Sequence, residues 1–196
     1  MITDINLLDF DKTYSYADYL TWMFHDRIEL FKGKIFAMSP APNRYHQIVS
    51  GNLHGMMWTA FKNHNCNLYA APFDVRLLNK NKSSANKGVF TVVQPDLCVI
   101  CDENKLDDKG AIGAPDLVIE ILSPGNSKKE MKYKYDLYEE AGVLEYWIVN
   151  PADKTILIFV LQNGVFVGQH PLIEEDKIKS LLFPNLDFEL DQIFNS

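Results

Sequence analysis

The chain has 196 residues, of which 47% are hydrophobic and 23% are charged, and its formal net charge is −7. This length allows one domain with a substantial core, so we expect residues 1–196 to form a single domain. No apolar run approaches the roughly 20 residues that cross a bilayer, and residues 1–12 lack the pattern of a secretory signal. We therefore expect a cytoplasmic protein without a membrane partner. The negative charge argues against broad, non-specific binding of nucleic acid.

The first half of the chain alternates helical and strand-like patterns. Apolar residues at helical spacing predict helices, and short runs rich in β-branched and aromatic residues predict strands. Pro95 interrupts the last of these runs, because a proline cannot donate to a ladder. In chain order, we predict a helix over 15–23, a hairpin of 27–31 and 34–38 turning at Lys32-Gly33, a helix over 43–63, and strands over 68–78 and 89–101.

The second half contains the most continuous apolar run, residues 115–122, which predicts a central strand. Ser127 and Glu130 stand in capping-box positions before a helix that Gly142 is placed to end. Together, the elements predict an α/β or α+β sheet with helices packed on it. In chain order, we predict a polar loop over 102–114, a strand over 115–122, a helix over 128–141, a strand over 145–150, a hairpin of 155–161 and 165–169 turning at Asn163-Gly164, and a packing segment over 180–194.

Two carboxylates stand on predicted strands. Gln94-Pro95-Asp96 opens one apolar run, and Glu120 lies among apolar residues inside another. A buried charge is costly unless it is paired or binds a metal. If the two strands are neighbours, Asp96 and Glu120 converge at one end of the sheet, where a hard cation such as Mg²⁺ would relieve their repulsion. The alternative is that each acid caps a turn or meets a surface lysine.

A lysine lies on the apolar side of the following helix. At about 100° per residue on a helical wheel, Lys134 falls between Tyr138 and Ala141 in the inward stripe. An inward lysine needs a counter-charge, and Glu120 is a candidate. Beside a metal-bound phosphate, Lys134 would position the attacking water or offset the negative charge that develops. The alternative is a lysine whose stem packs while its ammonium reaches water.

Other candidate ligands carry weaker signals. Glu29 is most simply a solvent-facing hairpin residue, although it could be a third acid, and His46 fits a surface or packing histidine better than a ligand. The chain has three cysteines, Cys66, Cys98 and Cys101. Cys98 and Cys101 lie in or just after an apolar run, so we expect them to be buried thiols in a reducing compartment, and a zinc site made of cysteines alone would need a fourth ligand.

Blocks of sequence spread over most of the chain form one pattern: Glu29-Leu-Phe-Lys-Gly33 with Met38-Ser39-Pro40 and His46, then Gln94-Pro95-Asp96, then Pro115-Asp116-Leu-Val-Ile-Glu120-Ile-Leu-Ser-Pro124, and finally Lys134, Tyr138 and Gly142-Val-Leu-Glu145-Tyr146-Trp147-Ile-Val149. On these blocks, the chain resembles the Uma-two family of restriction endonucleases, within the PD-(D/E)XK nuclease superfamily. The resemblance implies a restriction-endonuclease-like α/β fold with a mixed central sheet flanked by helices.

The resemblance also implies roles for individual residues. Asp96 matches the first acid of the family and Glu120 the second. The lysine of the superfamily normally stands two residues after the second acid, where this chain has Leu122, and in this family it has moved to the following helix, at Lys134. Gln94, beside the first acid, would orient a water or a phosphate. Glu29 and His46 also match family positions, and the residues alone give no role for them.

These observations lead us to expect a Mg²⁺-dependent endonuclease, with Mn²⁺ as a possible substitute, that hydrolyses DNA phosphodiester bonds. Asp96, Glu120 and the carbonyl of Ile121 would hold the metal, and Lys134 would assist the attack of water. Because phosphate contacts depend on Lys and Arg, an acidic chain would bind DNA through local lysines, the cleft of a homodimer or a partner protein. Two alternatives stay open: a non-catalytic binding or assembly protein that keeps the fold, and a metal-dependent hydrolase of another phosphate ester.

Overall fold

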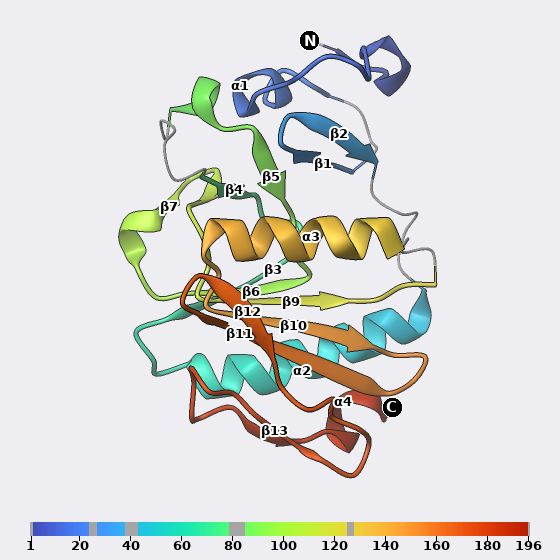
Figure 1. Ribbon diagram of the computed structural model, residues 1–196, viewed down its shortest axis with the longest axis vertical. Coiled ribbons are helices and arrows are strands. Elements are labelled where there is room, and N and C mark those ends of the chain that lie inside the picture. Colours follow the sequence, from blue (N-terminus) through green and yellow to red (C-terminus); the bar gives the residue numbers. More distant parts are fainter. Residues whose placement is uncertain (1, 24–26, 38–42, 79–84, 125–127, 196) are drawn as a thin grey trace.

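The computed structural model describes residues 2–23, 27–37, 43–78, 85–124 and 128–195, and it confirms the predicted α/β class. Within these residues, most strands belong to two six-stranded mixed sheets (Figure 1). Four α-helices accompany the sheets: α1 (Tyr16–Tyr19), α2 (Arg44–Phe61), α3 (Lys128–Ala141) and α4 (Asp191–Phe194). The predicted cap Ser127 lies outside the described residues.

The central sheet carries both predicted acids. Its strand order is β12-β11-β10-β9-β6-β3. As predicted, β9 is an inner strand, antiparallel to β6 and parallel to β10. Leu97 at the start of β6 pairs with Ile119 near the end of β9, so the two acids meet at one end of the sheet. The strands are β3 (Asn67–Ala70), β6 (Leu97–Ile100), β9 (Leu117–Ile121), β10 (Glu145–Asn150), β11 (Thr155–Gln162) and β12 (Val165–Gly168).

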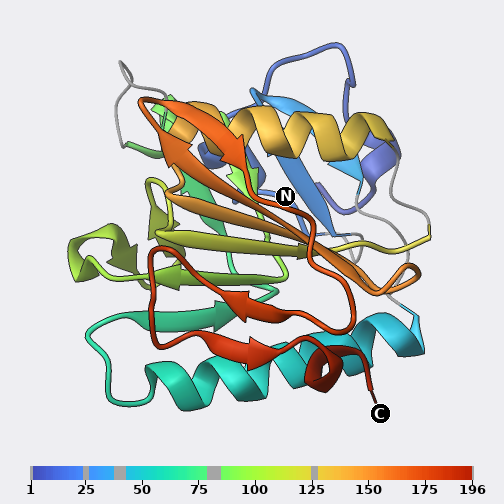
Figure 2. The same ribbon diagram turned by 60° about the horizontal axis from the view of Figure 1, so that its bottom comes forward.

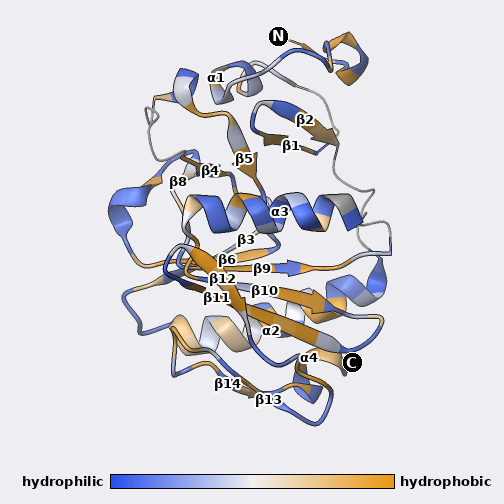
Figure 3. Cartoon of the chain, viewed as in Figure 1, coloured by the Kyte–Doolittle hydropathy of each residue, from blue (hydrophilic) through white to orange (hydrophobic). Residues whose placement is uncertain are grey.

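The two long helices cover opposite faces of the central sheet (Figures 1 and 2). Successive residues of a strand point to opposite faces. On β9, Leu117 and Ile119 pack with residues of α2, whereas Val118 packs with residues of α3. Figure 3 shows the resulting contrast between hydrophobic inner strands and the hydrophilic outer side of α3. Glu120 shares the face of Val118, so the alternation itself aims this carboxylate at α3.

The second sheet, here called the hairpin sheet, begins with the predicted hairpin. It turns at Lys32-Gly33, and both residues have a positive φ, of 53° and 85°. Glu29 lies opposite Phe36 in the register, so these side chains share one face. The strand order is β2-β1-β5-β4-β8-β7. The strands are β1 (Ile28–Phe31), β2 (Lys34–Ala37), β4 (Val75–Leu77), β5 (Thr91–Val93), β7 (Leu106–Asp107) and β8 (Gly110–Ile112).

Both predicted long strands are divided between the two sheets. The run 89–101 becomes β5 and β6, separated by Gln94-Pro95-Asp96, and the run 68–78 becomes β3 and β4, separated at the cis peptide bond Ala71-Pro72. The prediction of a plain loop over 102–114 was wrong, because this segment adds β7 and β8 to the hairpin sheet. Asp96 therefore stands where the chain crosses between the sheets.

The C-terminal segment packs as predicted. Asn163 and Gly164 turn the β11–β12 hairpin with φ values of 52° and 84°, and Gly142, with φ of 91°, follows the end of α3. β13 (Lys177–Lys179), β14 (Asp187–Glu189) and α4 close one side of the core, to which they contribute buried apolar side chains. No helix in the described ranges is long and apolar enough to span a bilayer.

The expectation of a buried thiol was wrong for Cys101. Cys66 and Cys101 form a disulfide, with Cα atoms 3.9 Å apart. In the β3–β6 pairing Asn67 lies opposite Ile100, so Cys66 and Cys101 are the next pair in the same register. Cys98 is a buried free thiol, as expected. The apolar run predicted burial, but it held no information about pairing across 35 residues.

Candidate active site

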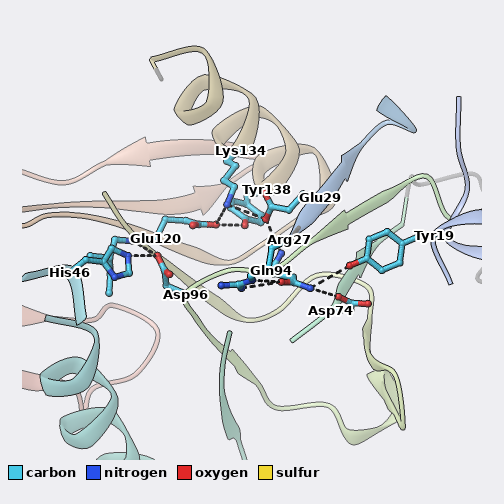
Figure 4. Close-up of polar contacts among 11 residues, drawn as sticks. Tyr19, Arg27, Glu29, His46, Asp74, Gln94, Asp96, Glu120, Lys134 and Tyr138 are labelled. Atoms are coloured by element: carbon cyan, nitrogen blue, oxygen red, sulfur yellow. Dashed lines mark hydrogen bonds and ion pairs between the residues drawn. The ribbon is translucent and has the colours of Figure 1, made fainter. Parts of the chain in front are cut away.

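Five of the residues singled out in the sequence come together where the sheets meet. Glu120 extends from β9, Lys134 from α3 and Glu29 from β1, while Asp96 lies just before β6 and His46 lies in the first turn of α2. Figure 4 shows their side chains in one cluster. We refer to these five residues as the acidic cluster.

Lys134 lies between two carboxylates of the acidic cluster. Its Nζ is 3.0 Å from Glu120 Oε1 and 3.1 Å from Glu29 Oε1. The Tyr138 hydroxyl donates a hydrogen bond of 2.6 Å to the same oxygen of Glu120. The inward orientation of Lys134 is therefore as predicted. The prediction of a solvent-facing Glu29 was wrong: this residue is 2% exposed, because its face of the hairpin packs toward α3.

The cluster holds more negative than positive charge. Burial is the largest cause that raises the pKa of Glu120 to about 7; the Asp96 and Glu29 carboxylates also raise this pKa, and Lys134 and Tyr138 offset only part of the rise. Burial lowers the pKa of Lys134, but the Glu120 and Glu29 carboxylates outweigh it and raise this pKa overall. Lys134 is therefore an ammonium at neutral pH. Three carboxylates against one ammonium leave a deficit of positive charge, which is the condition that favours a bound cation.

Asp96 and His46 form the other side of the cluster. The Ile121 amide donates a hydrogen bond of 2.8 Å to Asp96 Oδ2, and His46 Nε2 lies 3.5 Å from this oxygen. His46 is 5% exposed, and within the described part of the chain its buried Nδ1 has no hydrogen-bond partner. His46 is thus buried beside Asp96. Of the two expected positions, on the surface or packed in the interior, the structure shows the second.

The donor set fits a hard divalent cation. Among the described residues, no three His, Cys, Asp or Glu side chains are placed to form a metal site by themselves. Mg²⁺ does not need such a set, because it binds one or two carboxylates and retains several waters. The amide and carbonyl of a strand residue project to the same side, so the Ile121 carbonyl faces the side of Asp96. A cavity of about 20 Å³ beside Glu120 and Ile121 has room for a water-sized species.

A larger cavity lies away from the acids. It measures about 400 Å³ and is situated between the β1–β2 hairpin and α3, with Phe31, Phe36 and Tyr133 among its lining residues. None of the five cluster residues lines it. We place the candidate site at the small cavity because Glu120 and Lys134 of the acidic cluster line it.

Gln94 is connected to the cluster through its backbone. Its amide donates a hydrogen bond of 2.8 Å to Glu29 Oε1, whereas its side chain contacts Asp74 and Arg27. The sequence analysis missed these two residues. Arg27 could have been found from strand periodicity, since it stands two residues before Glu29 and so projects to the same face. No local signal identifies Asp74, whose place depends on how β4 pairs with β5.

A family model covers the residues of the candidate site. The family model Uma2, described as "Putative restriction endonuclease", matches residues 16–191. The chain belongs to the Uma2 family. The match contains every residue of the acidic cluster, so the cluster is part of the Uma2 domain and the Uma2 family supports a nuclease at family level.

Two further proteins are similar to this Uma2 chain. The crystal structure of a "putative nuclease belonging to DUF820" from Anabaena variabilis ATCC 29413 superposes with a TM-score of 0.70 at 17% identity, covering 92% of this chain and 97% of that chain. At this identity, the likeness shows the fold. The "Uncharacterized protein slr1290" of Synechocystis sp. (strain ATCC 27184 / PCC 6803 / Kazusa) is 24% identical over 134 residues, which are 67% of this chain and 65% of that protein.

Proposed function

We propose that this Uma2 protein is a Mg²⁺-dependent endonuclease that hydrolyses DNA phosphodiester bonds, with Mn²⁺ able to replace Mg²⁺. The observation that carries the proposal is the convergence of Asp96, Glu120 and Lys134 in a buried cluster with surplus negative charge. Asp96, Glu120 and the Ile121 carbonyl would hold the metal. When bound, the metal polarises a phosphoryl oxygen and lowers the pKa of a bound water.

Lys134 acts in this proposal through its charge. Its raised pKa keeps it protonated at neutral pH, so it stabilises negative charge on the phosphate and does not accept a proton. Contacts with Glu29 and Glu120 fix the ammonium, and the Tyr138 hydroxyl fixes the Glu120 carboxylate. His46 lies where it can orient the Asp96 carboxylate.

The test is a cleavage assay with matched variants. Supercoiled plasmid and single-stranded DNA are incubated with the protein and Mg²⁺ or Mn²⁺. Glu120→Gln removes a cluster carboxylate, and Glu189→Gln removes one from an exposed ion pair with Lys177 on the β13–β14 hairpin. We expect cutting by the wild type and Glu189→Gln, and none by Glu120→Gln or in EDTA. Equal cutting by wild type and Glu120→Gln would show a contaminant and remove the support.

The partners are part of the same proposal. The chain carries a net charge of −7, so DNA contacts must come from a few local cations, and a homodimer would double their number. Sedimentation equilibrium tests the homodimer directly. A protein that stays monomeric while it cuts DNA would remove the homodimer and leave the nuclease.

A further inference from the structure

An exposed arginine stands at the edge of the acidic cluster. Arg27 lies directly before β1, and its Nε and Nη2 donate hydrogen bonds of 3.3 Å and 3.0 Å to Gln94 Oε1 (Figure 4). It forms no ion pair with any carboxylate in the described ranges. A guanidinium has five N–H donors, so those not directed to Gln94 can meet an incoming anion.

A chain of hydrogen bonds fixes this guanidinium. The Gln94 side chain donates from Nε2 to Asp74 Oδ1 over 2.8 Å, and the Tyr16 hydroxyl donates to Asp74 Oδ2 over 3.0 Å. Because Asp74 accepts from the nitrogen end of the amide, the oxygen end faces Arg27. Tyr16 is 1% exposed, so the chain is anchored in the core.

Arg27 is also connected to the proposed metal site. Arg27 stands two residues before Glu29, so their side chains project to the same face of the strand. The backbone amide of Gln94 donates a hydrogen bond to Glu29 Oε1. Asp96 follows Gln94 by two residues. A polyanion that approaches three carboxylates is repelled, and a guanidinium without a carboxylate partner provides the charge-assisted bonds that a phosphate needs.

The buried Arg76 differs from Arg27 in its hydrogen-bond partners. Its Nη1 donates to Asp107 Oδ2 over 3.0 Å, and its Nε donates to the Ala111 carbonyl over 3.0 Å. It is 1% exposed and holds the hairpin sheet together. Arg76 is therefore committed to structure, whereas Arg27 is exposed and, among the described residues, its guanidinium donates to the amide oxygen of Gln94 and to no carboxylate.

We propose that Arg27 binds a DNA phosphate beside the bond that is cut, and that Gln94 and Asp74 are positioning residues for it. This inference rests on the proposed nuclease function and adds a substrate contact to it. It also reassigns Gln94: both ends of its side-chain amide are engaged within the protein, so it acts on substrate through Arg27.

The test measures binding separately from cleavage. Anisotropy of a labelled duplex oligonucleotide is followed in Ca²⁺, a cation that prefers oxygen ligands, from low to physiological salt. The variants are Arg27→Ala, Arg27→Lys and Gln94→Leu. The control is Lys62→Ala, which removes an exposed charge at the far end of α2, about 24 Å along the helix from His46. Thermal unfolding of each variant checks that the fold is intact.

We expect Arg27→Ala to lower the affinity about tenfold and to reduce the slope of log affinity against log salt by about one phosphate contact. Arg27→Lys should restore the slope but only part of the affinity. Gln94→Leu should lower the affinity by a smaller factor with the slope unchanged, because the charge remains. Lys62→Ala should match the wild type.

The possible negative results distinguish the Arg27 contact, the Gln94 role and the nuclease function. If the wild type cuts and binds DNA and Arg27→Ala binds with the same affinity and slope as Lys62→Ala, Arg27 is not a phosphate contact and the nuclease proposal stands. If Gln94→Leu equals the wild type, the positioning role is wrong. If the wild type neither binds nor cuts DNA, both proposals fail together.

Discussion

The function proposed for Glu120 conflicts with its buried position. Its carboxylate is needed in ionised form to hold a cation, yet burial beside two other acids raises its pKa to about 7. In the proposed function, a bound metal would resolve the conflict by supplying the missing positive charge. Without metal, the buried Glu120 carboxylate lowers the free energy of unfolding. One substitution at this position should therefore remove activity without lowering stability.

Replacing Glu120 with Gln should abolish cleavage and leave the metal-free protein at least as stable as the wild type. Below about pH 4.5 the carboxyl is protonated in both the folded and the unfolded state. As pH rises toward 7 the unfolded state loses this proton first, so the wild type loses stability that Glu120→Gln keeps, up to about 3 kcal/mol. Urea unfolding at pH 5 and pH 8 measures the difference. A difference that shrinks with rising pH would contradict the raised pKa.

Replacing Lys134 with Met should lower both activity and stability. Loss of one preorganised cation at the reacting phosphate reduces the rate about 100-fold or more, and two buried acids lose their partner, which costs about 3 kcal/mol near neutral pH. The double variant Lys134→Met with Glu120→Gln should regain part of the stability and none of the activity. A double variant that cuts DNA would show that the pair has no catalytic role.

The elements show which parts of the fold a sequence can specify. Helical periodicity predicted the inward orientation of Lys134, and the apolar run around Glu120 predicted an inner strand. Both predictions were possible because periodicity and hydrophobicity are local properties of the sequence. The division of run 89–101 between two sheets was not predictable, since it depends on which strands pair with each half. Glu29 was misjudged for the same reason: only the docking of the hairpin on α3 shows which of its faces is buried.

The hairpin sheet offers a control for effects on fold alone. Hydrogen bonds from Arg76 hold the pKa of Asp107 below its usual value. The stabilisation is therefore present above the unfolded pKa of about 3.9 and is lost as pH falls through the lower folded value. Asp107→Asn should lower the free energy of unfolding by about 1–2 kcal/mol at pH 7 and by less at pH 2. Cleavage at temperatures well below unfolding should be unchanged. An equal loss at both pH values in urea unfolding would contradict the ion pair.

For the whole molecule, the acidic composition and the acidic cluster both favour binding of a cation. A chain with a net charge of −7 gains from a bound divalent cation both locally and overall. Because the proposed ligands lie just before β6 and at the end of β9, a metal that binds only the folded state would stabilise the entire fold.

Mg²⁺ should therefore raise the melting temperature. At a free concentration ten times the Kd the gain is about 1.4 kcal/mol, which corresponds to roughly 3–5 °C for a chain of this length. Calorimetric melting of the wild type, Glu189→Gln and Glu120→Gln tests this. We expect the shift in the first two proteins only, and the same shift in Glu120→Gln would place the metal elsewhere.

The most direct measurement is anomalous diffraction from a crystal soaked with Mn²⁺. We expect a peak within about 2.0–2.3 Å of carboxylate oxygens of Asp96 and Glu120, with the Ile121 carbonyl beside it and the Lys134 ammonium nearby. If the protein cuts DNA with Mn²⁺ while its crystals hold the ion elsewhere and the acidic cluster is empty, the proposed metal site is wrong.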